Sequence, residues 1–340
     1  MIGSEEELDD LLSTPSAGLA ADLAAGSGDL AVLGAGGKMG PSLCRLARRA
    51  LDAAGRTGDQ VYAVSRWSDP AAARSLAAHG VRPVAFDLLS GADLGALPDA
   101  ADVVFMVGAK FGTGTAPYLA WEVNAALPSA VARRYPKARI AAFSTGNVYP
   151  FVPVSSGGCA EEDPVGPVGE YAMSCLGRER VFQHAAATRG TPLALIRLNY
   201  ALDLRYGVLA DLALAVRAGR AVDLTTGHVN VVWQGYANEV ALRLLRHAAP
   251  HPFVVNLTGP ETASVRAIAT GFAASFGVEA VFAGVEAPTA LLSDASLCHR
   301  LFGLPEVSLE TLVDWQAGWI ASGLPVSGKN TRFDVRDGRF

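Results

Sequence analysis

The chain has 340 residues, of which 50% are hydrophobic, and a formal net charge of −5. This length and apolar content suit a large α/β domain with a smaller lobe, and they exclude a disordered or fibrous chain. Lysine and arginine are scattered, and no uncharged apolar run reaches the roughly 18 residues of a membrane span. We therefore expect neither nucleic acid nor a membrane among its partners.

The first 28 residues are expected to form a helical extension. Ser4 is followed three residues later by Glu7, a capping-box pattern that predicts a short helix to about Leu12, and residues 17–25 predict a second one. The opening residues are acidic and lack the basic and then apolar pattern of a signal peptide. A cytoplasmic location is therefore expected.

The cysteines do not form a recognisable pattern. They lie far apart, at Cys44, Cys159, Cys175 and Cys298, without CxxC or HxxxH partners. This spacing predicts neither a disulfide framework nor a zinc site, and we expect no metal ligands and mostly buried, reduced thiols.

A nucleotide-sized turn follows the first predicted strand. Residues 30–33, LAVL, are apolar without alternation, which is typical of a strand buried on both faces. Gly34, Gly37 and Gly40 then have the spacing GxxGxxG, whose missing Cβ atoms permit a tight turn, close approach to a pyrophosphate and close helix packing. The helix expected at 41–54 would point its free N–H groups at the phosphates.

Strands and helices alternate from this point. Strands are expected at 30–34, 60–65, 82–86, 102–107, 138–144 and 193–198, and helices at 41–54, 70–79, 116–134 and 170–189. This alternation predicts an α/β fold with right-handed βαβ units and a doubly wound parallel sheet. The site should lie at the carboxyl ends of the strands.

The pattern changes after about residue 200. Helices are expected at 207–218, 236–248 and 264–276, strands near 229–233 and at 253–257, and amphipathic segments at 294–302 and 308–321. We interpret the chain as a helical extension at 1–28, a dinucleotide-binding domain at 29–199, a smaller α/β substrate lobe at 200–322 with segments returning to the main domain, and a polar tail at 323–340.

Two positions bear on the adenosine half of a dinucleotide. After the second strand, Ser65 and Arg66 favour NADP, because an arginine here can accommodate a 2′-phosphate, whereas an acidic residue would bind the ribose hydroxyls of NAD. Asp87 and Leu88, after the third strand, could flank an adenine. Solvated loop residues are the alternative in both places.

Several motifs together resemble the extended short-chain dehydrogenases/reductases, also called the NAD-dependent epimerase/dehydratase family. They include the glycine turn, Asp87-Leu88, VVFMVGA after the fourth strand, Asn124, FSTGNVYP, CAEEDPVGPVGEYAMS and FVVNLTGPETASVRAIA, and they span about residues 29–321. The resemblance implies a Rossmann fold and a homodimer, with the apolar helix 170–189 as a candidate interface. The cofactor contacts expected from the motifs are Gly34, Gly37, Lys38, Met39, Gly40, Ser65, Arg66, Asp87, Leu88, Val107, Gly108 and Ala109.

The same resemblance implies a catalytic pair. Thr145 corresponds to the family's Ser or Thr that hydrogen-bonds the reacting oxygen, and Tyr171 corresponds to its acid/base. The family pattern YxxxK is broken here, because Cys175 stands where a lysine normally lowers the pKa of the tyrosine. Without a cation, tyrosinate at pH 7 costs about 4 kcal/mol, on the order of a thousandfold in population.

Three explanations are open for this departure. A different cation fills the role, Tyr171 acts as a neutral acid or hydrogen-bond donor, or the protein is no longer a conventional redox enzyme. Lysine occurs only at Lys38, Lys110, Lys137 and Lys329. Lys110 directly follows the fourth strand, where the family's loop passes the nicotinamide ribose. We hypothesise that Lys110 replaces the missing lysine, with a surface-loop lysine as the alternative.

The candidate substrate contacts are Asn147, Asn199, Arg205, Trp233 and Gln234. Asn147 lies two residues past Thr145, and Asn199 and Arg205 follow the sixth strand. Trp233 and Gln234 could pack on and hydrogen-bond a sugar-like ring, although Trp233 could equally belong to the core of the lobe. No basic cluster in the lobe indicates a clamp for a nucleotide diphosphate, so a free sugar, sugar acid or polyol is expected as readily as a nucleotide sugar.

The sequence as a whole predicts an NAD(P)-dependent oxidoreductase or epimerase of sugar-like substrates. Hydride would move to or from a hydroxyl or carbonyl carbon with acid-base assistance from Tyr171 and Thr145, and the expected cofactor is NADP, with NAD possible. The alternative is a dinucleotide-binding sensor or scaffold without redox turnover, which the missing lysine supports.

Overall fold

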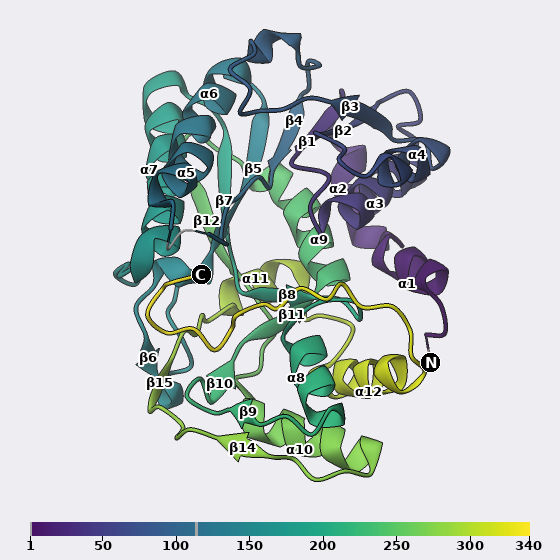
Figure 1. Ribbon diagram of the computed structural model, residues 1–340. Helices are drawn as coiled ribbons and strands as arrows, with labels where there is room; N and C mark the ends of the chain where they lie inside the picture. The colour runs from purple at the N-terminus through teal and green to yellow at the C-terminus, as the bar shows by residue number, and fades with distance from the viewer. Residues whose placement is uncertain (1, 113–114) are drawn as a thin grey trace.

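The computed structural model describes residues 2–112 and 115–340. Its centre is a seven-stranded parallel sheet with helices on both faces (Figure 1), which confirms the predicted fold class. The strands are β1 Leu30–Leu33, β2 Val61–Ser65, β3 Arg82–Ala85, β4 Asp102–Phe105, β5 Arg139–Thr145, β7 Leu193–Leu198 and β12 Phe253–Leu257. Their order is β12-β7-β5-β4-β1-β2-β3. The order reverses between β1 and β4, where parallel sheets of this type open a crevice at their carboxyl ends.

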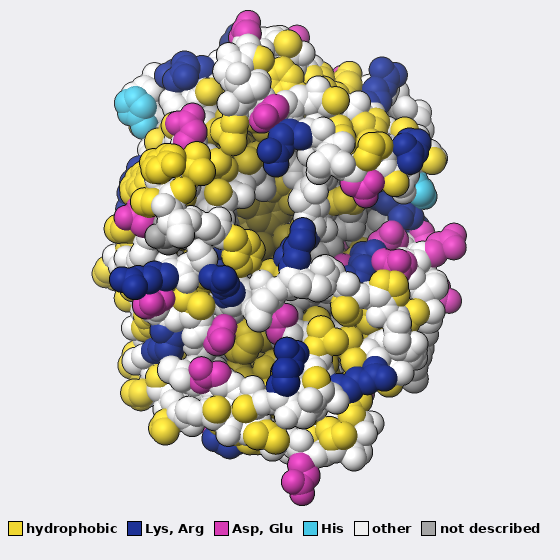
Figure 2. Space-filling view, in the orientation of Figure 1, with side chains coloured by type: hydrophobic (Ala, Val, Ile, Leu, Met, Phe, Trp, Pro, Cys, Tyr) yellow, Lys and Arg dark blue, Asp and Glu magenta, His cyan; other side chains and the backbone are white. Residues whose placement is uncertain are grey.

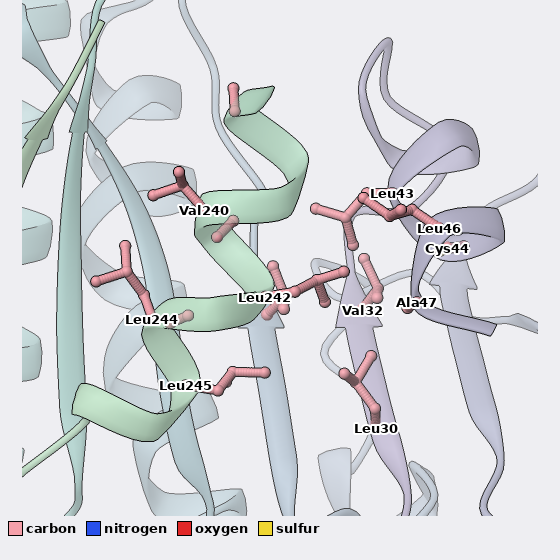
Figure 3. Close-up of a cluster of buried hydrophobic side chains, with 14 of the residues drawn as sticks. Leu30, Val32, Leu43, Cys44, Leu46, Ala47, Val240, Leu242, Leu244 and Leu245 are labelled. Atoms are coloured by element: carbon pink, nitrogen blue, oxygen red, sulfur yellow. The ribbon is translucent and has the colours of Figure 1, made fainter. Parts of the chain in front are cut away.

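The core lies on both faces of the sheet, because side chains of β1 alternate between them. Leu30 and Val32 point toward helix α3 Gly40–Ala53 and helix α9 Gln234–Arg243 (Figure 3), and Ala31 and Leu33 belong to the cluster on the opposite face. This packing explains why the β1 sequence is apolar without alternation.

The predicted helix at 116–134 is interrupted. It consists of α5 Pro117–Trp121, the π-helical turn η2 Glu122–Ala126 and α6 Leu127–Arg134. A π turn inserts an extra residue into a helix and often marks a functional position. Here it contains the buried Asn124. The other helices of the sheet domain are α4 Pro70–Ala78 and α7 Gly169–Arg189, with short 3₁₀ turns at η1 Leu94–Ala96, η3 Gly146–Val148 and η4 Val154–Ser156.

The two predicted N-terminal helices are present and pack on the sheet domain. They are α1 Glu5–Leu12 and α2 Ala17–Ala24, and α2 contacts both α3 and α9. Ser4 caps α1 by accepting a hydrogen bond from the Glu7 backbone N–H at 3.1 Å. The Glu7 carboxylate accepts from the backbone N–H of Gly3 rather than from that of Ser4.

A second layer of short strands and helices lies below the sheet domain in Figure 1. Its helices are α8 Val208–Arg217, α10 Val265–Phe276, α11 Ser296–Phe302 and α12 Leu309–Ala321, and η5 Leu244–His247 continues α9. Its paired strands are β8 Tyr200–Leu202 with β11 Val231–Trp233, β9 Val222–Asp223 with β14 Phe282–Ala283, β10 His228–Val229 with β13 Ala263–Ser264, and β6 Val152–Pro153 with β15 Thr289–Ala290. The boundaries of the domains stay a prediction. Within the described ranges, no helix is both long enough and apolar enough to pass through a bilayer.

The segment expected only as a polar tail is packed against the rest of the protein. Drawn in yellow in Figure 1, it runs from α12 between the two layers toward the carboxyl ends of the central strands. Phe333 and Phe340 are buried, and Thr331 binds the carboxylate of Asp211 through its N–H and its hydroxyl. Two aromatic side chains in a segment without periodicity thus anchor it through tertiary contacts.

Candidate active site

A cavity of about 380 Å³ opens at the carboxyl ends of the central strands. Figure 2 shows it as a hollow in the middle of this face, with an apolar floor and a basic side chain at its edge. Of the residues predicted from the sequence, its lining includes Gly34, Gly37, Lys38, Met39, Val107, Gly108, Lys110, Thr145, Asn147, Tyr171, Asn199 and Gln234. The fold therefore brings the candidate cofactor, catalytic and substrate residues to one place.

The glycine turn at the edge of this cavity fits a dinucleotide. Gly34 has a φ of +92°, and a Cβ there would contact Val107 at 3.0 Å. A Cβ on Gly40 would collide with the carbonyl oxygen of Ala35. Helix α3 begins at this turn, and no described side chain caps it at Met39. Its free N–H groups are therefore available to a phosphate.

Six predicted cofactor residues do not line the cavity: Gly40, Ser65, Arg66, Asp87, Leu88 and Ala109. Ser65 lies against the glycine turn, at Gly36, and Arg66 is exposed beside it. Asp87 is also exposed, and its carboxylate accepts from the Leu89 N–H at 3.0 Å, as in an ordinary Asx turn. Leu88 packs partly into the core, and the backbone of Ala109 is held by Asn124.

Tyr171 and Thr145 meet inside the cavity. Tyr171 is in the first turns of α7, and Thr145 ends β5. Burial raises the pKa of Tyr171 above its ordinary value, and Cys175 raises it further, whereas Arg178 and a hydrogen bond with Thr145 lower it. The net direction is upward, so the phenol is protonated at neutral pH. This geometry can hold a substrate oxygen between two hydroxyl groups.

Cys175 does not replace a lysine. Its thiol is fully buried behind Tyr171, in a cluster with Val148, Tyr149 and Cys159. Burial raises the pKa of the Cys175 thiol, so it brings no charge of either sign to the site at neutral pH. All four cysteines are buried as free thiols.

Lys110 lines the cavity but is engaged by the C-terminal segment. Its ammonium group donates to the Thr331 carbonyl oxygen at 2.9 Å and lies 4.3 Å from the centre of the Phe340 ring. Burial lowers its pKa to about 8. The sequence hypothesis that Lys110 replaces the missing lysine stays a prediction.

Two of the predicted substrate residues lie elsewhere. Arg205 forms ion pairs with Asp9 at 2.8 Å and Asp203 at 3.0 Å and does not line this cavity. Trp233 is buried in the core of the lower layer, edge-on to Trp315 at 5.9 Å between ring centres. The Arg205 side chain is thus engaged by carboxylates of α1 and of its own turn, and Trp233 belongs to the core of the lower layer, so a substrate contact by either residue stays a prediction.

The other three remain at the cavity. The amide nitrogen of Gln234 donates to the Ser42 hydroxyl at 2.9 Å, which fixes α9 to α3. The side-chain oxygen of Asn199 accepts from Ser293 at 2.9 Å, and that of Asn147 accepts from Thr145 at 3.2 Å. All three side chains line the cavity, and these hydrogen bonds hold them in place.

Sequence reasoning missed Arg178 and Phe340. Arg178 lies on α7 and lines the cavity, and the Phe340 ring contacts that of Tyr171 edge-on at 5.6 Å. The spacing of seven residues from Tyr171 to Arg178 is a helical signal that could have been noticed. Nothing in the sequence around Phe340 indicates its contact. Across the described residues, no group of three or more acidic, His or Cys side chains is arranged to hold a metal ion.

Comparison with known proteins finds similarity of structure. No protein-family model matches the sequence, and neither does any curated protein. The UDP-glucuronic acid 4-epimerase of Bacillus cereus, solved in complex with NAD, matches with a TM-score of 0.72 and 18% identity over 86% of this chain and 98% of that chain. The UDP-glucose 4-epimerase of Thermotoga maritima matches with a TM-score of 0.69 and 15% identity over 87% and 99%.

A third structure agrees with these two. The dTDP-glucose 4,6-dehydratase of Streptomyces venezuelae, with NAD bound, matches with a TM-score of 0.70 and 18% identity over 86% of this chain and 97% of that chain. This chain has the fold of these epimerases and of the dehydratase. The fold inferred from its motifs is confirmed.

Proposed function

We propose that this protein is an NAD(P)-dependent oxidoreductase or epimerase that acts on a hydroxyl or carbonyl carbon of a sugar, sugar acid or related polyol. The observation that carries the proposal is the meeting of Tyr171 and Thr145 in the cavity that the glycine turn borders. Two of the similar structures, a UDP-glucuronic acid 4-epimerase and a dTDP-glucose 4,6-dehydratase, were solved with NAD, which supports the same class of reaction.

The residues at the glycine turn would hold the dinucleotide. The backbone from Gly34 to Gly37 and the N-terminus of α3 would bind the pyrophosphate, with Lys38 beside it. Ser65 and the exposed Arg66 would lie at the adenosine ribose, where Arg66 supports NADP and the bound cofactor of the similar structures supports NAD. When bound, the dinucleotide supplies or accepts a hydride at the substrate carbon.

Tyr171 would move the proton. Because its phenol is protonated at neutral pH, it can donate its proton to a carbonyl oxygen while a hydride arrives at the carbonyl carbon. The phenolic O–H bond breaks, the substrate O–H bond forms, and a phenolate remains until it is reprotonated. Thr145 would hold the same oxygen. In the oxidation direction the phenolate accepts the hydroxyl proton.

The second candidate is a dinucleotide-binding sensor without turnover. It is favoured by the buried thiol at Cys175 and by the Phe340 ring, which covers one side of Tyr171. Both features are unfavourable for proton transfer, the first because it brings no charge and the second because it restricts access.

Cofactor fluorescence separates the two functions. With the oxidised and the reduced forms of NADP or NAD and a panel of sugars and sugar acids, the enzyme should exchange hydride, and Tyr171→Phe should lower the rate by roughly 10²–10⁴-fold with unchanged cofactor affinity. Tyr118→Phe, at an exposed position of α5, is the matched control. Cofactor binding without any exchange would identify the sensor, and absence of binding would contradict both.

We also propose that the protein is a homodimer. Tyr118, Leu119 and Trp121 of α5 and Met173 of α7 are exposed and apolar. Figure 2 shows apolar side chains gathered on the left of the molecule, over α5. A surface of this kind is suited to self-association about a two-fold axis.

A further inference from the structure

Three residues of α7 lie on the same side of the helix. Tyr171, Cys175 and Arg178 are separated by four and three residues, which places them one above another on a face. Tyr171 and Arg178 both line the cavity, and Cys175 is buried between them. The cation absent from position 175 is therefore present one turn further along the same face.

Arg178 is held rigidly by neutral groups. Its guanidinium donates to the Phe143 carbonyl oxygen at 2.6 Å and to the Asn124 side-chain oxygen at 2.6 Å, and its Nε donates to the Asn124 carbonyl oxygen at 3.4 Å. The same Asn124 fixes the backbone of Ala109 in the loop after β4. The π turn thus places Asn124 where it can orient both the arginine and the loop.

The charge of Arg178 has no carboxylate partner among the described residues, although the residue is only 4% exposed. The contrast with Arg197 is direct, because that buried guanidinium is paired with Glu179 at 2.9 Å. A buried cation without a counter-ion is costly, and such groups concentrate at functional sites. Arg178 is therefore placed to stabilise a negative charge that forms in the cavity.

We propose that Arg178 is the positioning residue that supplies the positive charge beside Tyr171 in place of the missing lysine. The proposal rests on the proposed function, in which the phenol of Tyr171 donates its proton and becomes a phenolate. Arg178 stabilises that phenolate through space, without transferring a proton itself, since a guanidinium stays protonated.

Other titratable groups reach the cavity from different elements. Lys38 comes from the glycine turn and Lys110 from the loop after β4, and Tyr200 and Tyr206 come from the segment after β7. Burial raises the pKa of both of these tyrosines, so they are neutral at neutral pH. Lys110 contacts the C-terminal segment, whereas Arg178 is fixed to the helix that carries Tyr171 and lowers the pKa of that tyrosine.

A fluorinated tyrosine at position 171 tests the charge directly. Its lower intrinsic pKa brings ionisation into a measurable range, and its fluorine NMR shift reports this position alone. Arg178→Met should raise the pKa at position 171 by about one unit or more, and Arg178→Lys should stay near the wild type because it retains the charge. Arg180→Met, at an exposed position of the same helix, should leave the pKa at position 171 unchanged.

The outcomes distinguish this inference from its rivals. An unchanged pKa in folded Arg178→Met, checked by circular dichroism, would overturn it. If the role of Arg178 were purely structural, Arg178→Lys and Arg178→Met would change the pKa at position 171 by the same amount. If Lys110→Met raised that pKa as much as Arg178→Met does, the charge would belong to Lys110 instead. Because the titration needs no turnover, absence of hydride exchange in the wild type would reject the proposed function and leave this measurement decisive for Arg178.

Discussion

Lysine is rare in this chain, yet two of its four lysines, Lys110 and Lys329, act on a third, Lys38. Lys329 and Lys110 both lower the pKa of Lys38, although burial is the larger cause and brings that pKa to about 8. Asp211 and Asp203 act in the opposite direction. Lys38 therefore loses its charge just above neutral pH, at the turn where we place the pyrophosphate.

Dinucleotide affinity should consequently fall as the pH rises through about 8. A bound pyrophosphate favours protonated Lys38, so deprotonation weakens binding, by roughly tenfold for the loss of one charge-assisted hydrogen bond. Fluorescence titration with the reduced cofactor between about pH 7 and about pH 9 measures how steeply the affinity changes with pH. Lys38→Met should bind more weakly at neutral pH and with a shallower slope. If the affinity of Lys38→Met fell with pH as steeply as that of the wild type, a group other than Lys38 would be responsible for the pH dependence.

At the scale of elements, the C-terminal segment closes one side of the active site. The backbone carbonyl of Phe340 accepts a hydrogen bond from Gly112 at 3.1 Å, and Arg336 donates to the Thr289 carbonyl oxygen at 2.9 Å. Together with the contact between Thr331 and Lys110, these bonds tie the segment to both layers. A ligand that reaches Tyr171 from this side has to displace the Phe340 ring.

Phe340→Ala should therefore accelerate cofactor association. An edge-to-face aromatic contact contributes about 1 kcal/mol, so its loss should increase the open fraction and the association rate roughly fivefold. Stopped-flow fluorescence of reduced cofactor measures this rate. Arg339→Ala, whose side chain is 84% exposed, is the control and should match the wild type. Equal rates for all three proteins would mean that the ligand enters elsewhere.

At the scale of the whole molecule, α5 and α7 carry exposed apolar side chains at one side of the sheet domain. Trp121 donates to the Glu170 carboxylate at 2.7 Å, which holds its ring against α7. Leu119 beside it is 54% exposed. A second copy of the chain would bury both side chains.

Leu119→Glu should convert a dimer into a monomer. The new carboxylate would be buried against its symmetry mate, which is unfavourable without a partner charge. Light scattering after size-exclusion chromatography gives the mass. Val285→Glu, at a position 84% exposed in the lower layer, is the matched control and should leave the mass unchanged. A monomeric wild type would reject the proposed homodimer.

The sequence by itself determined the α/β fold, because its signals are local. The apolar strand at 30–33, the three glycines and the periodic helix after them specify their own structures within a few residues, and consecutive βαβ units can assemble in few ways. Thr145 and Tyr171 could be named for a different reason, because the motifs around them, FSTGNVYP and CAEEDPVGPVGEYAMS, resemble those of a known family.

Only the tertiary structure decided how the site is completed. The contact of Phe340 with Tyr171, the ion pairs of Arg205 and the burial of Trp233 join residues far apart in the chain, and no local pattern encodes such partners. Arg178 is the intermediate case. Its helical spacing is readable, but its lack of a counter-ion is visible only when every neighbour has been placed.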